Sequence, residues 1–347
     1  MKVLNTSTVK RESYAVKFDF SLMWESALGI AAITYTEMLS TLDQPQDYWD
    51  NIFDSITSEL SKELDLVQKE NTWKALLQLL HESNSQSISD FTNFVLNVED
   101  EQLRFYCLPY MGNNYEQIRT AAAKGDQIAI QQSIEITRGH KFFPRYIKFI
   151  ANVDISILRE HVINVLTKWF EEIVLPNSEH LTSILSRDVN LKNEQKAQLT
   201  AEEFVSWVTG GIEYLPEPTV THVLLIPHFV YRPWTIEAKI KDTKIFYYPV
   251  HNDSIHPNDK YVADHLLMLK HKALGDVLRL KILKLLFEKN RSLQELTTLL
   301  DISKSTIHHH LSILRSARLV LVNRSIYSLN IHVLTTLDFE LKQYLNK

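Results

Sequence analysis

The sequence contains almost none of the residue that builds disulfides and thiolate metal sites. Among 347 residues there is a single cysteine, Cys107. One thiol excludes an internal disulfide framework and any metal site made of several thiolates. Cys107 lies in the apolar context Phe-Tyr-Cys-Leu of residues 105–108. This context favours a buried structural thiol over a reactive nucleophile.

Glycine is also scarce, with only seven residues in the chain. The sequence has no glycine-rich loop of the kind that cradles phosphates. It has no Gly-x-Ser-x-Gly elbow and no His-Glu-x-x-His helix either. These absences argue against the common nucleotide-dependent, hydrolytic and metalloprotease classes. We therefore expect a protein that is not an enzyme and that uses no cofactor.

Long apolar runs are missing as well. No run reaches the roughly 18 residues that a membrane span needs. The richest stretch, residues 28–35, is flanked by Glu25 and Glu37 and predicts a buried helix. The N-terminus has no basic region followed by an apolar core, so no secretory signal is expected. The sequence thus predicts a cytoplasmic protein with no membrane partner.

The net charge of −5 conceals an uneven distribution. Residues 260–347 hold 14 Lys and Arg against 7 Asp and Glu, whereas residues 1–259 hold 23 against 35. A basic C-terminal part on an acidic body is typical of a polyanion-binding module joined to a regulatory body. Chance segregation of surface charge produces the same pattern. Charge alone therefore leaves both interpretations open.

Hydrophobic periodicity divides the chain into a helical body and a later segment with strands. Residues 14–20 alternate apolar and polar side chains, which indicates one short strand. Residues 21–209 are mostly of helical period, and the period changes after Gly210-Gly211. A proline-punctuated stretch, residues 249–257, indicates a domain boundary. Further strands are predicted over residues 220–227, 235–240 and 243–248, the last two forming a hairpin around Lys241-Asp242.

The last quarter of the chain has its elements in the order of a winged helix-turn-helix. A capping box at residues 292–295 begins a short helix, and Ser303 is placed to cap the next one. We expect helices over residues 261–273, 277–288, 292–300 and 304–316, two strands over 319–322 and 325–329, and a final helix. The fold class is therefore mainly α. A helical N-terminal body with a small β element spans residues 1–250, a linker spans 251–260, and an α+β winged helix-turn-helix spans 261–347.

The predicted helix over residues 304–316 separates cleanly into two faces. Ile307, Leu311 and Leu314 point to one side and are expected in the core. Small hydroxyls, imidazoles and cations remain on the other side, and these groups suit a DNA major groove. The positive end of the helix dipole favours a phosphate near its first turn. The exposed set is Lys304, Ser305, His308, His309, Ser312 and Arg315.

These residues resemble the ArsR family of bacterial repressors. The family pattern Leu-Gly-Asp followed by Arg-Leu-x-Ile-Leu occurs at residues 274–276 and 279–283. The recognition-helix pattern occurs at residues 303–311 as SKSTIHHHL. The resemblance covers about residues 261–330. It implies a transcriptional repressor that binds a double-stranded DNA operator as a homodimer.

The resemblance and the helix faces together assign roles to single side chains. We expect base-edge contacts from Lys304, Ser305, His308 and His309, and phosphate contacts from Arg315, Arg324 and Lys281. Arg324 lies at the tip of the predicted wing, where it reaches the backbone or a minor groove. Ser303, Thr306 and Ser312 complete the expected DNA-binding surface.

One departure from the family concerns metal. The family's thiolate metal site falls on the helix that begins near Ser292, but residues 292–300 contain no cysteine. Sensing of arsenite or cadmium by that site is therefore excluded. His332 and Asp338 of the last helix do not make up a full zinc ligand set. The sequence predicts a regulator that binds no metal.

The last helix carries a stripe of leucines at three-four-four spacing: Leu334, Leu337, Leu341 and Leu345. This stripe either packs on its own domain or forms the seam of a symmetric dimer. A two-fold operator needs two paired recognition helices, which favours the dimer.

The N-terminal body has a weaker resemblance. Residues 17–25 (KFDFSLMWE) and 225–234 (LIPHFVYRPW) resemble the N-terminal domain of longer ArsR-like regulators, which has no assigned chemistry. His228, Tyr231 and Arg232 are candidates for the rim of an effector pocket. Alternatively they are ordinary strand and loop residues, with Arg232 in a surface ion pair.

Two functions for the body remain open. It either binds a small-molecule effector that shifts DNA binding, or serves as a constitutive platform for oligomerisation and protein contacts. In a further alternative, the whole chain is a non-enzymatic scaffold whose winged helix and body contact proteins.

Overall fold

The computed structural model describes residues 14–39, 41–259, 261–323 and 325–346. The chain forms two compact units. The N-terminal unit comprises residues up to Asn190 together with Glu217–Val250, and the C-terminal unit comprises Leu191–Pro216 and His251–Lys347. The chain therefore passes between the units three times. Within the described ranges, no helix is both long enough and apolar enough to cross a membrane.

A four-stranded mixed sheet lies in the N-terminal unit. Its order is β1-β2-β4-β3, in which β1 pairs parallel to β2, β2 parallel to β4, and β3 antiparallel to β4. The predicted strands are confirmed within one or two residues. The parallel pairing was not predicted, because periodicity identifies strands without their partners. The strands are β1 (Ala15–Phe18), β2 (His222–His228), β3 (Ile236–Ile240) and β4 (Thr243–Pro249).

Helices make up the rest of the N-terminal unit, and many begin at a side-chain cap. Ser21, Thr57 and Asp154, for example, each accept a hydrogen bond from a first-turn amide. The helices are α1 (Leu22–Thr34), α2 (Thr36–Leu39), α3 (Gln46–Ser55), α4 (Ser58–Glu70), α5 (Trp73–Ser83), α6 (Ile88–Asn97), α7 (Asp100–Cys107), η1 (Asn113–Tyr115), α8 (Glu116–Ala123), α9 (Gln127–Ile136), α10 (Phe143–Asn152), α11 (Ile155–Trp169), the π-helical η2 (Phe170–Val174), η3 (Leu175–Asn177) and α12 (Ser178–Gln195).

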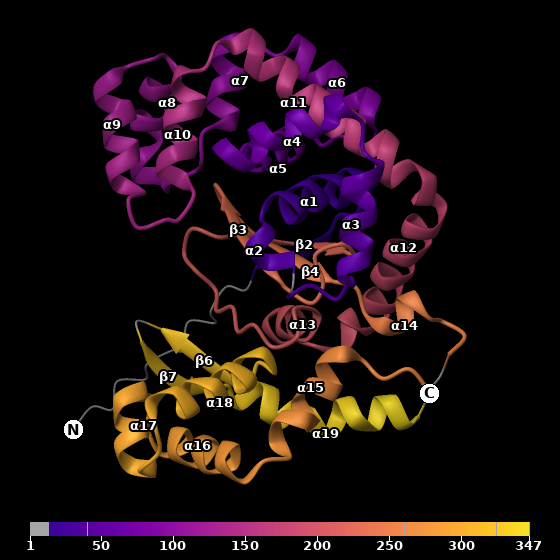
Figure 1. Cartoon of the computed structure of the whole chain (residues 1–347), viewed down its shortest axis with the longest axis vertical. Coiled ribbons are helices and arrows are strands. Elements are labelled where there is room, and N and C mark those ends of the chain that lie inside the picture. Colours follow the sequence, from indigo (N-terminus) through magenta and orange to yellow (C-terminus); the bar gives the residue numbers. More distant parts are fainter. Residues whose placement is uncertain (1–13, 40, 260, 324, 347) are drawn as a thin grey trace, which may run out of the picture. The chain divides into compact units, whose positions relative to one another are not determined.

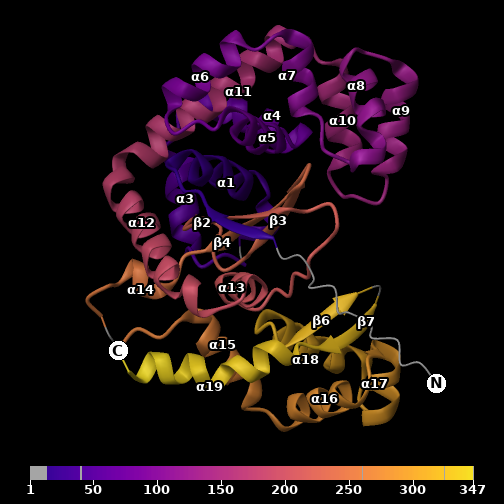
Figure 2. The same ribbon diagram turned by 180° about the vertical axis from the view of Figure 1, so that it is seen from behind.

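Helix α1 is the centre of the N-terminal unit. Every residue from Met23 to Thr34 is buried, as the apolar run 28–35 predicted. The helix lies between the sheet and the helices α4, α5 and α11 (Figures 1 and 2). Gly29 allows close packing here, because a Cβ at this position would lie 2.9 Å from the indole ring of the buried Trp169. Cys107 is also buried, and burial raises its thiol pKa to about 12.

The C-terminal unit has the winged helix-turn-helix arrangement that the sequence predicted, so the mainly α fold class is confirmed. Its three-stranded sheet has the order β5-β7-β6, and all pairs are antiparallel. The elements are η4 (Lys196–Gln198), α13 (Ala201–Val208), α14 (Asn252–Ile255), α15 (His265–Leu274), α16 (Val277–Glu288), β5 (Arg291–Ser292), α17 (Leu293–Leu300), α18 (Lys304–Ser316), β6 (Val320–Asn323), β7 (Ile326–Leu329) and α19 (Ile331–Leu345).

Helix α13 belongs to the C-terminal unit, whereas the sequence placed it in the N-terminal domain. The residues that directly follow it are held by two side chains of the winged helix. The guanidinium of Arg318 donates to the carbonyl of Thr209, and the amide of Asn330 donates to the carbonyl of Gly211 over 3.1 Å. Gly211 has φ +108°, and a Cβ there would overlap Val333. In the sequence, the strands β2, β3 and β4 lie between α13 and residue 251. Only tertiary contacts therefore show that α13 belongs to the C-terminal unit.

One residue of α16 differs from expectation. The apolar residues Leu280, Ile282, Leu283, Leu285 and Leu286 were all expected in the core. Ile282, Leu283 and Leu286 are buried, but Leu280 is 49% exposed. A helix turns by about 100° per residue, so five positions within seven residues cannot all face one core.

Candidate nucleic-acid interface

The turn between α17 and α18 is built from three local signals in the sequence. Ser292 and Glu295 form the predicted capping box, with the Ser292 amide donating to Glu295 over 2.7 Å. Asp301 ends α17 in the left-handed conformation, with φ +52°. Ser303 then caps α18 by accepting from the Thr306 amide over 3.2 Å. Together these contacts fix where the recognition helix begins.

Helix α18 has the two faces that were predicted. Ile307, Leu311 and Leu314 are at most 1% exposed and pack into the core of the C-terminal unit. The side chains left on the outside carry hydroxyl, imidazole, ammonium and guanidinium groups. The exposed predicted residues are Ser303, Lys304, Ser305, Thr306, His308, His309, Ser312 and Arg315, and Lys281 of α16 is exposed as well.

The N-terminus of α18 gathers three hydroxyl groups. The Ser303 hydroxyl lies 3.0 Å from that of Ser305 and 2.8 Å from that of Thr306. All three side chains are exposed at the positive end of the helix dipole. This end of the helix is therefore chemically suited to a phosphate group, with Lys304 beside it.

The Leu-Gly-Asp and Arg-Leu-x-Ile-Leu motif has a structural basis. Asp276 caps α16 by accepting from the Arg279 amide over 2.9 Å, and this hydrogen bond lowers the pKa of the Asp276 carboxyl. The Arg279 guanidinium in turn donates to the carbonyls of Ala273, over 2.6 Å, and Lys272 at the end of α15. The motif thus joins two helices at a corner.

Only two of the three consecutive histidines are exposed. His310 is half-buried, and its Nδ1 lies 3.8 Å from the Asp276 carboxylate. His308 and His309 remain on the outer face. One imidazole of α18 is therefore partly buried, and the other two are exposed and free to contact a ligand.

The wing is a hairpin of β6 and β7, in which Asn323 pairs with Ile326 (Figure 2). Ser325, in the turn, has φ +66°. Tyr327 anchors the hairpin in the core and is 7% exposed. Arg324, the predicted tip residue, lies outside the described residues.

The leucine stripe of α19 is only partly covered within the chain. Leu334 packs against the core, whereas Leu345 is 70% exposed. Leu337 and Leu341 are half-buried. Val333 is not one of the predicted leucines, yet it is 1% exposed and packs in the core of the C-terminal unit.

The three candidate effector residues are buried in the N-terminal unit. His228 is fully buried and 3.0 Å from the Trp234 carbonyl, and burial lowers its pKa to about 3. The Tyr231 hydroxyl donates to Met38. Arg232, 7% exposed, pairs with Asp43 over 3.1 Å and donates to the Val250 carbonyl over 2.6 Å. The expected surface ion pair is thus largely buried.

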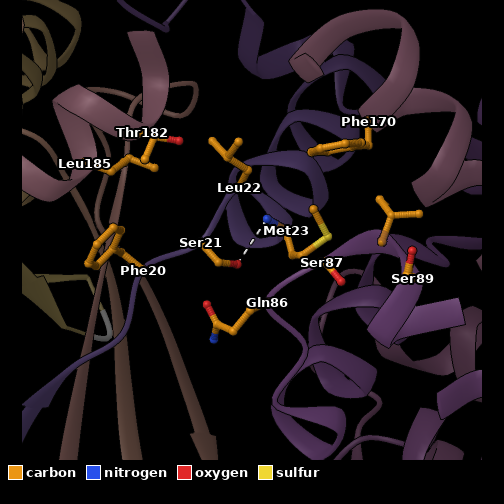
Figure 3. A pocket seen from close by; sticks show the side chains of 11 residues that line it. Phe20, Ser21, Leu22, Met23, Gln86, Ser87, Ser89, Phe170, Thr182 and Leu185 are labelled. Carbon is orange, nitrogen blue, oxygen red and sulfur yellow. Dashed lines mark hydrogen bonds between the residues drawn. The ribbon is translucent and has the colours of Figure 1, made fainter. Parts of the chain in front are cut away.

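A separate cavity of about 450 Å³ lies in the same unit (Figure 3). None of the three candidate effector residues lines it. The lining residues are Phe20, Ser21, Leu22, Met23, Gln86, Ser87, Ile88, Ser89, Phe170, Thr182 and Leu185.

Comparison with known proteins identifies the helix-turn-helix. Residues 276–321 match the family described as "Bacterial regulatory protein, arsR family". This segment contains α16, α17, α18 and the first two residues of the wing strand β6. The family consists of non-enzymatic regulators that bind double-stranded DNA through this domain. No curated protein and no solved structure matches the chain.

Proposed function

Because the chain carries an arsR-family helix-turn-helix and is a DNA-binding transcriptional regulator, we propose that it is a dimeric repressor whose N-terminal unit senses an effector. The single observation that carries this proposal is the outer face of α18. Eight predicted DNA-binding residues from Ser303 to Arg315 are exposed there, while Ile307, Leu311 and Leu314 fill the core behind them. A helix exposed in this way is ready to enter a major groove.

The side chains divide by reach and chemistry. Lys304, Ser305, His308 and His309 start the helix and contact base edges, where hydroxyl, imidazole and ammonium groups read donors and acceptors. Lys281 and Arg315 contact phosphates, which fix the position of the domain on the duplex. Both are cationic and exposed.

The dimer uses the leucine stripe of α19. Leu337 and Leu341 are half-buried and Leu345 is mostly exposed within one chain, so a second copy has apolar surface to cover. We expect Leu341→Asp to convert the dimer to a monomer in sedimentation velocity, because it places a charge in an apolar seam. The matched control is Lys342→Asp, since Lys342 is exposed and its only described partner is Asp338, over 2.7 Å. A stable dimer of the Leu341 variant contradicts this seam.

A gel shift of the full chain tests the proposed function. The probe is the region upstream of its own gene, with scrambled competitor, at two salt concentrations. We expect sequence-selective binding that weakens as salt rises, because phosphate contacts release counterions. Binding equal to that of the competitor contradicts operator recognition and favours the scaffold alternative. Pull-down of genomic fragments then distinguishes two explanations of such a result. Either the operator lies elsewhere in the genome, or the winged helix contacts only proteins.

A further inference from the structure

The cavity in Figure 3 lies where several elements of the N-terminal unit meet. Phe20 and Ser21 follow the carboxyl end of β1, and α1 begins immediately after them. The first residues of α6, the side chain of Phe170, and Thr182 and Leu185 of α12 complete the wall.

Six of the eleven lining residues are apolar and five are neutral polar, and the pocket opens to solvent at the exposed Gln86, Ser89 and Thr182. Met23 and Leu185 are each 1% exposed and lie among six apolar lining residues. No Asp, Glu, Lys, Arg or His is among the lining residues. A charged ligand would meet no opposite charge among these residues, so an uncharged molecule fits best. The volume of about 450 Å³ is within the range of small-molecule pockets.

Two helix starts add donors to this wall. Ser21 caps α1 by accepting from the Met23 amide over 3.1 Å, and Ser87 caps α6 by accepting from the Asp90 amide over 3.1 Å. In both cases the hydroxyl oxygen is the acceptor, so its own proton remains available to a ligand. A carbonyl or ether oxygen on the ligand meets this requirement.

Helix α12 connects the cavity wall with the C-terminal unit. Thr182 and Leu185 lie in its first half, whereas its last turn, from Leu191 to Gln195, belongs to the C-terminal unit. Because the helix is continuous across this boundary, we expect it to carry any coupling between the cavity wall and the C-terminal unit. Five residues separate α12 from α13, namely the three of η4, then Leu199 and the cap residue Thr200.

Helix α13 is in turn fastened to the end of the recognition helix. Arg318, which donates to the Thr209 carbonyl, follows α18 by two residues. Asn330, which donates to Gly211, caps α19. The residues just after α13 are thus hydrogen-bonded to Arg318, just after α18, and to Asn330, the cap of the leucine-bearing helix.

We propose that the cavity is the effector site, that it takes an uncharged, mainly apolar small molecule with one hydrogen-bond acceptor, and that occupancy changes operator affinity through α12 and α13. The claim that occupancy changes operator affinity rests on the proposed function. The claim that the cavity binds a ligand does not involve DNA, so the two claims can fail separately.

Binding is tested on the full chain with prodan, an uncharged naphthalene ketone whose emission shifts to the blue in apolar surroundings. We expect saturable binding with one probe per chain. Thr182→Trp fills the cavity and should weaken it tenfold or more. Ser183→Trp is the matched control, since Ser183 is an exposed neighbour on α12 that does not line the cavity. Ser89→Trp on α6, also exposed and lining, is the second variant if the first fails to fold.

Equal prodan binding by the wild type and by both cavity variants overturns the site, and so does an absence of binding to the wild type. The anionic probe 1-anilinonaphthalene-8-sulfonate tests the ligand class. If it binds as tightly as prodan and loses affinity in the same variants, the ligand is not restricted to uncharged molecules.

Coupling is tested by a tethered ligand. Thr182→Cys labelled with benzyl methanethiosulfonate places a phenyl ring in the cavity, and Ser183→Cys labelled in the same way is the control. The native Cys107 is buried and does not interfere. We expect operator affinity to change fivefold or more in the first and less than twofold in the second, as is usual for allosteric coupling. Changes below twofold in both overturn the coupling while operator binding itself stands. If the two cysteine variants do not bind operator even before labelling, the proposed function fails. Prodan binding then still shows whether the cavity is a ligand site.

Discussion

The guanidinium of Arg318 donates a hydrogen bond to the backbone carbonyl of Thr209. The two residues are 109 positions apart in the sequence. Arg318 is in the left-handed region, with φ +57°, and burial lowers its pKa to about 10. A partly buried cation needs its hydrogen-bond partners, because leaving it without them costs free energy. This contact joins α13 to the end of the recognition helix and makes α13 part of the DNA-binding unit.

Arg318→Ala is expected to lower the free energy of unfolding by about 2–3 kcal/mol, since it removes a hydrogen bond from a charged donor and leaves the Thr209 carbonyl without it. Urea unfolding followed by circular dichroism measures this loss. Arg315→Ala is the control, because Arg315 is exposed three residues earlier. Its stability should stay within about 0.5 kcal/mol of the wild type while its DNA affinity falls. A stable Arg318 variant would show that the contact is dispensable.

The face of α18 predicts two kinds of loss in operator binding. Lys304→Ala and His309→Ala should each cost about 1–3 kcal/mol and relax base preference at one position. Lys281→Ala should weaken all sequences alike and reduce the salt slope by about 1. Titrations of operator and single-base variants at several salt concentrations measure both effects. Lys342→Ala on α19 is the control for loss of an exposed lysine. Unchanged affinity in Lys304→Ala and His309→Ala means that another face binds DNA.

Gly29→Ala is expected to destabilise the N-terminal unit by up to about 2 kcal/mol, the difference between an overpacking cost and a gain in helix propensity. The added Cβ would lie 2.9 Å from the Trp169 ring, and overpacking of a core costs about 1–3 kcal/mol. Alanine recovers about 1 kcal/mol of helix propensity. Gly139→Ala is the control, since a Cβ there meets no atom within 4 Å. Thermal unfolding of both variants decides the matter, and equal stability would show that Trp169 moves aside.

His228 predicts that stability depends on pH. Burial lowers its folded pKa to about 3, against 6.5 for the ordinary group. Below pH 6.5 the unfolded chain takes up the proton first, so stability is full above pH 6.5 and falls with pH until about pH 3. The loss is about 1.4 kcal/mol for each pH unit in this window. His228→Gln keeps a donor for the Trp234 carbonyl and should remove this part of the dependence in urea titrations at pH 7.5 and pH 5.

A neighbouring carboxyl acts in the opposite sense. Burial raises the pKa of Glu25 to about 7, so its protonation stabilises the fold as pH falls from 7 toward 4.5. Each variant is therefore compared with the wild type at the same pH. His180→Gln controls for the loss of a histidine, since His180 is exposed. A His228 variant with the wild-type pH profile would mean that its imidazole does not resist protonation.

Local patterns in the sequence were enough to predict the recognition helix. The Ser303 cap, the buried Ile307 and Leu311 and the exposed His308 all follow from helical spacing within a few residues. The same holds for the Ser292 capping box and for the strands. Spacing fails where burial depends on distant partners. His228 and Arg232, for example, are buried although they are polar.

The sequence by itself determined the element types, the faces of α18 and the arsR-like motif, because capping and periodicity act between residues that are near in the chain. Only the tertiary structure decided that α13 joins the C-terminal unit, that β1 pairs in parallel with β2 some 200 residues later, and that a cavity forms between Ser21 and Thr182. Long-range contacts depend on shape and packing across the whole chain, and no local pattern encodes which distant surfaces fit one another.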